Sequence, residues 1–149
     1  MGRQRSCWLG GWGVVLVILG GCGGGEPFAL VPLTGKITYD DGSLIPGDRV
    51  VVCFVPVERQ SHGKDVFSGS QGELDMKSGQ IVGVTTHKYA DGTMAGRYKV
   101  TVAAVKDGRN GMQVFTTAVP QQYQDAQTTP LVCEVVRGRA IVLTVAKPR

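Results

Sequence analysis

The feature that most constrains the fold is a set of short runs in which apolar and polar side chains alternate with a period of two. The run 97–104 places Tyr98, Val100 and Val102 on one side and Lys99, Thr101 and Ala103 on the other. Alternation with this period separates two sets of side chains onto opposite faces of a β-strand. The run 49–57 is apolar on both sides, as in a central strand that is covered on both faces. We therefore expect an all-β fold.

The other expected strands are shorter and are separated by turn residues. They cover residues 33–39, 74–76, 80–86, 114–117, 131–136 and 140–145. The turns at 40–43 and 91–92 combine aspartate with glycine, and Arg137-Gly138 is expected to join the last two strands as a hairpin. Residues 58–72 are polar and glycine-rich, which is typical of a long surface loop. Together these elements predict a single small antiparallel β-sandwich of about seven strands over 33–149.

The first 21 residues have the layout of an export signal. Arg3 and Arg5 precede an apolar stretch over 8–19, which ends in the small pair Gly20-Gly21. A stretch of about twelve residues is shorter than the roughly twenty that a membrane-spanning helix needs. A removable signal is therefore the better interpretation of 1–21.

The four residues Leu19-Gly20-Gly21-Cys22 resemble a bacterial lipobox, in which lipid is attached to the cysteine thiol and the chain is cut just before it. Small residues before the cut suit an extended backbone in a peptidase, and the thiol is the nucleophile for lipid transfer. We expect acyl chains on Cys22 as the only attached group, with no other cofactor, and a flexible tether over 22–32. The alternative is a conventional or uncleaved signal in which Cys22 has no role.

The charge of the chain from Cys22 onward argues against a nucleic-acid partner. Removal of Arg3 and Arg5 leaves 14 basic and 12 acidic residues, a net charge of +2. No stripe of lysine and arginine, interleaved with aromatic residues, is present to bind phosphates and bases. The expected partners are the membrane, through the lipid, and a protein or glycan of the cell envelope.

Several segments, taken in order, resemble one known family. The segment 34–40 is followed by Ile45-Pro46-Gly47 before the apolar run, then by Asp91-Gly92 before 96–102, and finally by a proline-, tyrosine- and threonine-rich segment over 119–131. This order is similar to the carboxypeptidase-regulatory-like, or transthyretin-like, β-sandwich of small lipoproteins from planctomycete-type bacteria. The resemblance covers most of 33–146 and implies no catalytic residues. The C-terminal residues lack the motif of transthyretin-like hydrolases.

Few residues offer catalytic or metal-binding chemistry. His62 and His87 lie in expected loops without metal-ligand spacing, and no serine lies in a nucleophile-elbow motif. The aspartates beside turn glycines are explained by turn chemistry, so we assign no catalytic residue and no metal site. The alternative is an envelope enzyme of the hydrolase type, whose site would be assembled from these loop histidines and nearby acids.

Two further groups of residues are candidates for structure or binding. Cys53 and Cys133 fall on expected strands, and they either form a disulfide or are two small buried side chains. Tyr89, Phe115 and Tyr123 lie in or near loops and form a candidate binding patch, with capping of the core as the alternative. We therefore expect a non-enzymatic, exported protein that is anchored in the cell envelope by lipid and presents a binding or structural module.

Overall fold

The structure is a computed structural model that describes residues 28–108 and 110–149, and the expected signal and Cys22 lie outside these ranges. The described chain is all-β, as the alternating runs predict, with a single 3-10 turn, η1 (Gln121–Tyr123). Its strands are β1 (Leu30–Val31), β2 (Gly35–Tyr39), β3 (Arg49–Pro56), β4 (Gln60–His62), β5 (Asp65–Phe67), β6 (Ser70–Leu74), β7 (Ile81–Thr85), β8 (Thr93–Met94), β9 (Gly96–Asp107), β10 (Gln113–Phe115), β11 (Val132–Val135) and β12 (Ile141–Val145).

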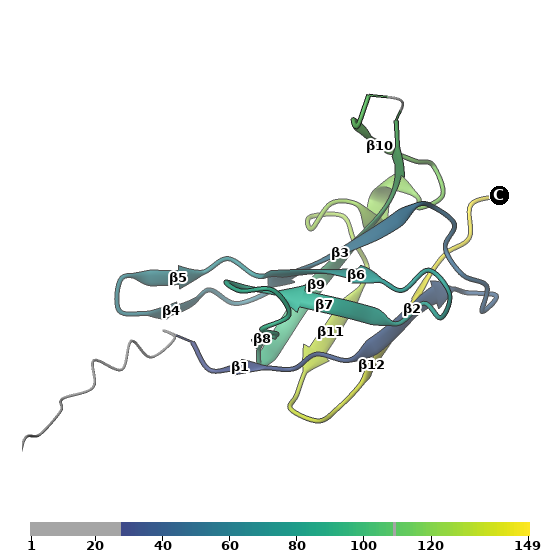
Figure 1. Ribbon diagram of the computed structural model, residues 1–149. Coiled ribbons are helices and arrows are strands. Elements are labelled where there is room, and N and C mark those ends of the chain that lie inside the picture. The colour runs from purple at the N-terminus through teal and green to yellow at the C-terminus, as the bar shows by residue number, and fades with distance from the viewer. Residues whose placement is uncertain (1–27, 109) are drawn as a thin grey trace, which may run out of the picture.

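The largest sheet has six strands and is antiparallel throughout. Its order is β10-β9-β3-β6-β7, and β11 also pairs with β9. Strand β9 is long enough to pair with β11 near its start and with β10 near its end, both on the side away from β3. This arrangement makes β3 and β9 the centre of the sheet (Figure 1).

The core lies between one face of this sheet and a second, two-stranded sheet formed by β2 and β12, which run parallel. Val52 and Val102 face each other across β3 and β9 and are fully buried, as are Ile37 on β2 and Val145 on β12. The predicted alternation of 97–104 is confirmed, because Tyr98, Val100 and Val102 are buried whereas Lys99, Thr101 and Ala103 are half-buried. Two packed layers around one core are consistent with the expected sandwich.

The prediction of a long loop over 58–72 is wrong. Strands β4 and β5 form a hairpin that projects from one end of the domain, and β6 begins at Ser70 as an inner strand of the large sheet (Figure 1). The hairpin carries mostly polar side chains, so it lacks the hydrophobic alternation that would reveal its strands. Phe67, at its base, is the residue that anchors it in the core.

The expected pairing of the last two strands with each other is also wrong. The turn at Arg137-Gly138 exists, with a positive φ of 76° at the glycine. However, β11 pairs with β9 in the large sheet and β12 pairs with β2 in the small one. The turn therefore carries the chain from one layer to the other.

The folded domain begins earlier than the expected boundary at Leu33. Phe28 and Val31 are buried in the core, and β1 pairs with β8. Phe28 makes an edge contact with Phe67 at a centroid distance of 5.6 Å and stacks on His87 at 6.0 Å. Residues 28–32, which were expected to be part of a tether, therefore belong to the folded domain. Within the described part of the chain, no helix is long and apolar enough to cross a membrane.

Candidate functional site

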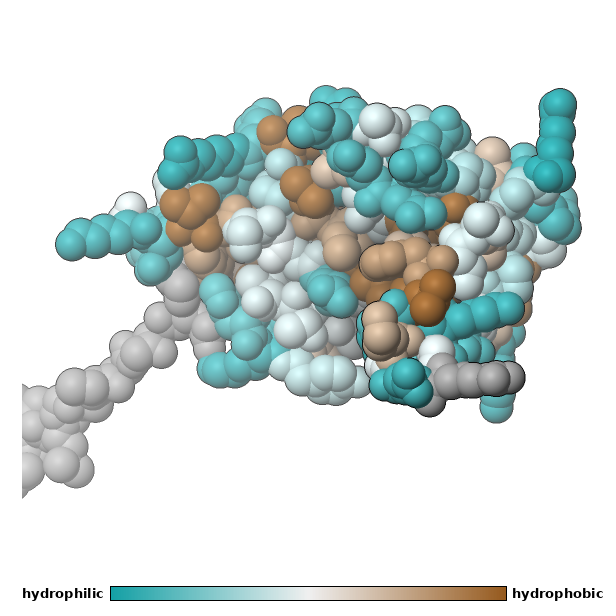
Figure 2. Space-filling view, turned by 90° about the horizontal axis from the view of Figure 1, so that it is seen from above, coloured by the Kyte–Doolittle hydropathy of each residue, from teal (hydrophilic) through white to brown (hydrophobic). Residues whose placement is uncertain are grey.

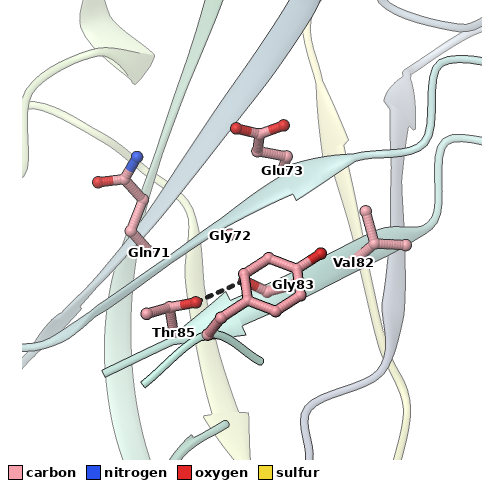
Figure 3. Close-up of a pocket in the computed structure, with 7 residues that line it drawn as sticks. Gln71, Gly72, Glu73, Val82, Gly83 and Thr85 are labelled. Carbon is pink, nitrogen blue, oxygen red and sulfur yellow. Dashed lines mark hydrogen bonds between the residues drawn. The ribbon is translucent and has the colours of Figure 1, made fainter. Parts of the chain in front are cut away.

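The best-defined hollow lies on strands β6 and β7, on the face of the large sheet that points away from the core. It has a volume of about 370 Å³ and is lined by Gln71, Gly72, Glu73, Val82, Gly83, Thr85 and Tyr89 (Figure 3). Gln71 and Glu73 alternate along β6 with three buried residues, so their side chains point outward. The hollow therefore combines an amide, a carboxylate and an aromatic ring on a rigid sheet.

A β-bulge in β7 shapes the floor of this hollow. Gln71 pairs with Thr85 and Glu73 with Val82, so β7 has one more residue than β6 between these pairs. The extra residue is accommodated at Gly83, whose φ is +61°. A Cβ atom at this position would lie 3.5 Å from the ring of Tyr89, so the ring lies directly over the glycine. The bulge is the element that brings the loop aromatic back over the sheet.

The loop that carries Tyr89 is held by one carboxylate. Asp91 accepts hydrogen bonds from the backbone N–H groups of Thr86, His87 and Lys88 at 2.6, 2.9 and 2.8 Å. The hydroxyl of Thr86 donates to the carbonyl oxygen of Gly92 at 2.7 Å. With its ends fixed in this way, the loop presents Tyr89 with 88% of its surface exposed. An exposed aromatic ring on an ordered loop is suited to binding rather than to core packing.

The ionisation of Asp91 predicts a dependence of stability on pH. Burial raises the pKa of this carboxyl, but the hydrogen bonds from backbone N–H groups outweigh burial and place the pKa below its usual value. The stabilisation is therefore complete above the unfolded pKa of about 3.9 and is lost as pH falls through the lower folded pKa. We expect Asp91→Asn to melt at a lower temperature than the wild type at neutral pH, with a gap that narrows at about pH 2.5. Thermal unfolding at both pH values tests this, and a gap of constant size would contradict it.

A second hollow continues the first across the sheet. It also has a volume of about 370 Å³, and it is lined by Cys53, Phe54 and Val55 of β3, by the segment 68–71 that leads into β6, and by Thr85 and Thr86 at the end of β7. The two hollows share Gln71 and Thr85. We call the two together the β3–β6–β7 groove. It lies on the outer face of three neighbouring strands of the large sheet.

The electrostatics of the groove are nearly neutral. Glu73 is the carboxylate in the first hollow, and its Oε1 atom lies 2.7 Å from Nη2 of Arg49. Both side chains are more than a third exposed, so the pair contributes little to stability. No lysine or arginine lines either hollow. The groove thus favours neutral ligands over phosphates and other anions.

The three aromatic residues of the expected patch are not brought together. Tyr89 lines the groove, whereas Tyr123 is buried in the core and its hydroxyl accepts a hydrogen bond from the N–H of Ala146 at 3.0 Å. Phe115 is 68% exposed on β10, which is separated from β7 by three intervening strands. At about 4.8 Å between neighbouring strands, Phe115 lies roughly 19 Å from β7. Of the three residues, Tyr89 alone lines the β3–β6–β7 groove.

Phe115 belongs to a different surface. With Met112 and Val114 it forms an exposed apolar group on the β9–β10 hairpin. Figure 2, which looks down on the side of the domain where β10 lies in Figure 1, shows several brown and tan residues gathered on that face. None of these three residues lines the β3–β6–β7 groove.

Of the two alternatives for Cys53 and Cys133, the structure has free thiols and no disulfide between them. Cys133 pairs with Tyr98 and points into the core, whereas Cys53 alternates with buried neighbours and points to the outer face. Their strands, β3 and β11, lie on opposite sides of β9, about 9.6 Å apart, which exceeds the Cα separation of a disulfide. Burial raises the pKa of both thiols, that of Cys133 to about 11, so neither is a reactive thiolate at neutral pH.

The two histidines occupy different structural settings. His62 is exposed on the β4–β5 hairpin, where it pairs with Asp65 in the ladder. His87 stacks on Phe28 and covers the start of the folded chain. Neither histidine lines the β3–β6–β7 groove, and residues 28–108 and 110–149 contain no group of three histidine, cysteine, aspartate or glutamate residues that could hold a metal ion.

The sequence analysis missed most of the groove. Gln71 and Glu73 lie in the segment expected to be a loop or at its border, and single polar residues on a strand carry no distinctive signal. Gly83 within an expected strand was the one available indication, because an isolated glycine in a strand pattern often marks a bulge. Comparison with known proteins gives no family assignment: no protein-family model matches the chain, and neither the curated proteins nor the solved structures yielded a match.

Proposed function

We propose that this chain is an exported lipoprotein of the cell envelope, anchored by acyl chains on Cys22, whose transthyretin-like β-sandwich is a non-catalytic binding module. The observation that carries the proposal is the order of basic residues, short apolar stretch, small pair and cysteine over 3–22. The early start of the folded domain supports it, because Phe28 is already buried six residues after Cys22.

The short link between Cys22 and the core would keep one end of the domain near the membrane. Six residues span at most about 20 Å when fully extended. Phe28 is clamped between Phe67, at the base of the β4–β5 hairpin, and His87 in the 86–92 loop. This end of the domain would therefore stay within about 20 Å of Cys22. Because Tyr89 lies in the same loop as His87, the groove would open close to the membrane surface.

A binding role is supported over the alternative of an envelope enzyme. A hydrolase would need His62, His87 and a carboxylate to converge in a hollow, and the groove is lined by neither histidine. The groove instead offers one aromatic ring, neutral polar side chains and one carboxylate, that of Glu73, which is ion-paired with Arg49. This composition fits recognition of a ligand without chemistry on it.

The direct test of the anchor is membrane fractionation of cells that produce the wild type, Cys22→Ala or Cys7→Ala. We expect the wild type in the membrane fraction, resistant to washing with high salt, because two or more acyl chains hold a protein stably. Cys22→Ala should lose this attachment or accumulate with residues 1–21 uncut. Cys7→Ala is the matched control, since Cys7 precedes the apolar stretch and should have no effect. If Cys22→Ala lost residues 1–21 and still attached to membranes as firmly as the wild type does, the proposal would be refuted.

A further inference from the structure

The β3–β6–β7 groove has features that indicate one chemical class of ligand. Its first hollow contains an exposed aromatic ring, Tyr89, next to the outward side chains of Gln71 and Glu73. Aromatic faces carry partial negative charge and attract the weakly positive C–H groups of a ligand that lies flat on them. A pyranose ring with equatorial hydroxyl groups presents such a C–H face, with the hydroxyls arranged around its edge.

The polar groups beside the ring remain available to those hydroxyls. Figure 3 shows that, among the side chains drawn, only Thr85 makes a hydrogen bond to another residue of the group, from its hydroxyl to the carbonyl oxygen of Gly83 at 3.0 Å. The Gln71 amide can both donate and accept, and the Glu73 carboxylate has an oxygen beyond the one that faces Arg49. Amide and carboxylate groups thus match the two hydrogen-bonding roles of a hydroxyl.

The shape and charge of the groove restrict the class of ligand further. The second hollow continues the first through Gln71 and Thr85, and it adds the hydroxyl of Ser68 and the apolar surface of Val55. Two joined hollows of about 370 Å³ each accept consecutive units of a chain rather than a monosaccharide. The carboxylate of Glu73 and the lack of lysine or arginine in the lining disfavour acidic glycans.

Preorganisation adds a second, independent indication. The Asp91 hydrogen bonds hold the loop, and the bulge at Gly83 holds the ring over the sheet. An ordered aromatic side chain loses little entropy when a ligand stacks on it. The ordered and exposed ring of Tyr89 is therefore a preformed surface on which a ligand can stack.

We infer that the β3–β6–β7 groove binds a neutral oligosaccharide of glucose-configured pyranose units, with Tyr89 as the stacking platform and with Gln71 and Glu73 bonding to the hydroxyls. This inference deepens the proposed function and depends on it for the location of the ligand in the envelope. In that setting the ligand would be a neutral glycan within reach of the membrane surface.

The test is a binding titration of the full chain, extracted from membranes in a detergent without a sugar headgroup. The probes are cellohexaose and chitohexaose, with the acidic hexamer of galacturonic acid as comparison. Calorimetry or amide chemical shifts report binding. We expect saturable binding of at least one neutral hexamer and weaker binding of the acidic one.

Three variants locate the site. Tyr89→Ala should weaken binding about tenfold, by loss of stacking and of the buried ring surface. Tyr89→Phe keeps the ring and should bind nearly as the wild type does. Phe115→Ala removes a comparably exposed ring from β10 and should leave affinity unchanged. Because Tyr89 is 88% exposed, its removal should not unfold the domain, and a melting curve of each variant verifies this.

The inference is overturned if folded wild-type protein binds neither neutral hexamer, if Tyr89→Ala binds as well as the wild type, or if the acidic hexamer binds as tightly as the neutral ones. These outcomes are separable from failure of the proposed function. A protein that is attached to membranes through Cys22 but binds no sugar refutes the groove ligand alone, whereas sugar binding without attachment through Cys22 refutes the anchor alone.

Discussion

Replacing Tyr98 with alanine is expected to lower the free energy of unfolding by about 3–5 kcal/mol. The side chain is fully buried on β9, and its ring makes edge contacts with Phe54 and Phe67, both at a centroid distance of 6.3 Å. The variant would leave a ring-sized cavity where β3, β9 and the base of the β4–β5 hairpin meet. Urea unfolding of the variant and the wild type, followed by far-UV circular dichroism, gives the difference in the free energy of unfolding.

The matched control for this prediction is Tyr98→Phe. It keeps the ring and removes the hydroxyl, which donates a hydrogen bond to the carbonyl oxygen of Met94 at 2.8 Å and accepts a longer one from the hydroxyl of Thr93 at 3.4 Å. Loss of these hydrogen bonds costs about 1–2 kcal/mol. If the two variants were equally unstable, the ring contacts would not be the main contribution, and the central role of Tyr98 in the core would be refuted.

Replacing Gly69 with alanine is the second substitution with a large expected effect. Its φ of +117° lies in a region that L-residues rarely adopt, and an added Cβ would lie 2.2 Å from the carbonyl oxygen of Phe54. Both the torsion and the clash fall at the point where β6 begins to pair with β3. We expect a loss of about 2–4 kcal/mol in the free energy of unfolding.

Gly42→Ala separates the two causes. Gly42 has a φ of +81° in the turn after β2, but a Cβ there would have no atom within 4 Å. The expected loss is therefore the torsional cost alone, about 1 kcal/mol. Chemical unfolding of both variants under the same conditions makes the comparison. Equal losses in the free energy of unfolding at the two positions would show that the close approach of β3 and β6 does not require glycine at position 69.

The parts of the fold that could be predicted from sequence are those where burial imposes a pattern. Strand β9 is central, and its side chains record the two faces of the sheet in alternation. Strand β3 is apolar on both faces, and the expectation that both are covered is wrong, because its outward residues Val51, Cys53 and Val55 are only half-buried. Strand pairing leaves no comparable record, because alternation specifies which face a residue occupies and not which strand lies beside it. For this reason the last two strands were predicted correctly as strands but were paired wrongly with each other.

Of the residues that line the groove, only Tyr89 could be singled out from the sequence as a binding candidate. Tyr89 is an aromatic residue in a polar loop, and that identified it as a candidate. Tyr123 has the same local appearance, yet the chain folds it into the core, because tertiary packing and not local sequence decides between capping and exposure. The bulge at Gly83 and the outward position of Gln71 depend on the register between β6 and β7, which the sequence alone does not specify.

The measurement that tests the central claim most directly is the intact mass of the protein purified from the membrane fraction. The account predicts a chain that begins at Cys22 and carries the additional mass of a diacylglyceryl group, with or without a further acyl chain on the new N-terminus. It also predicts that Cys22→Ala yields no such species. An unmodified mass that retains residues 1–21 would contradict the lipid anchor, and with it the placement of the groove beside the membrane.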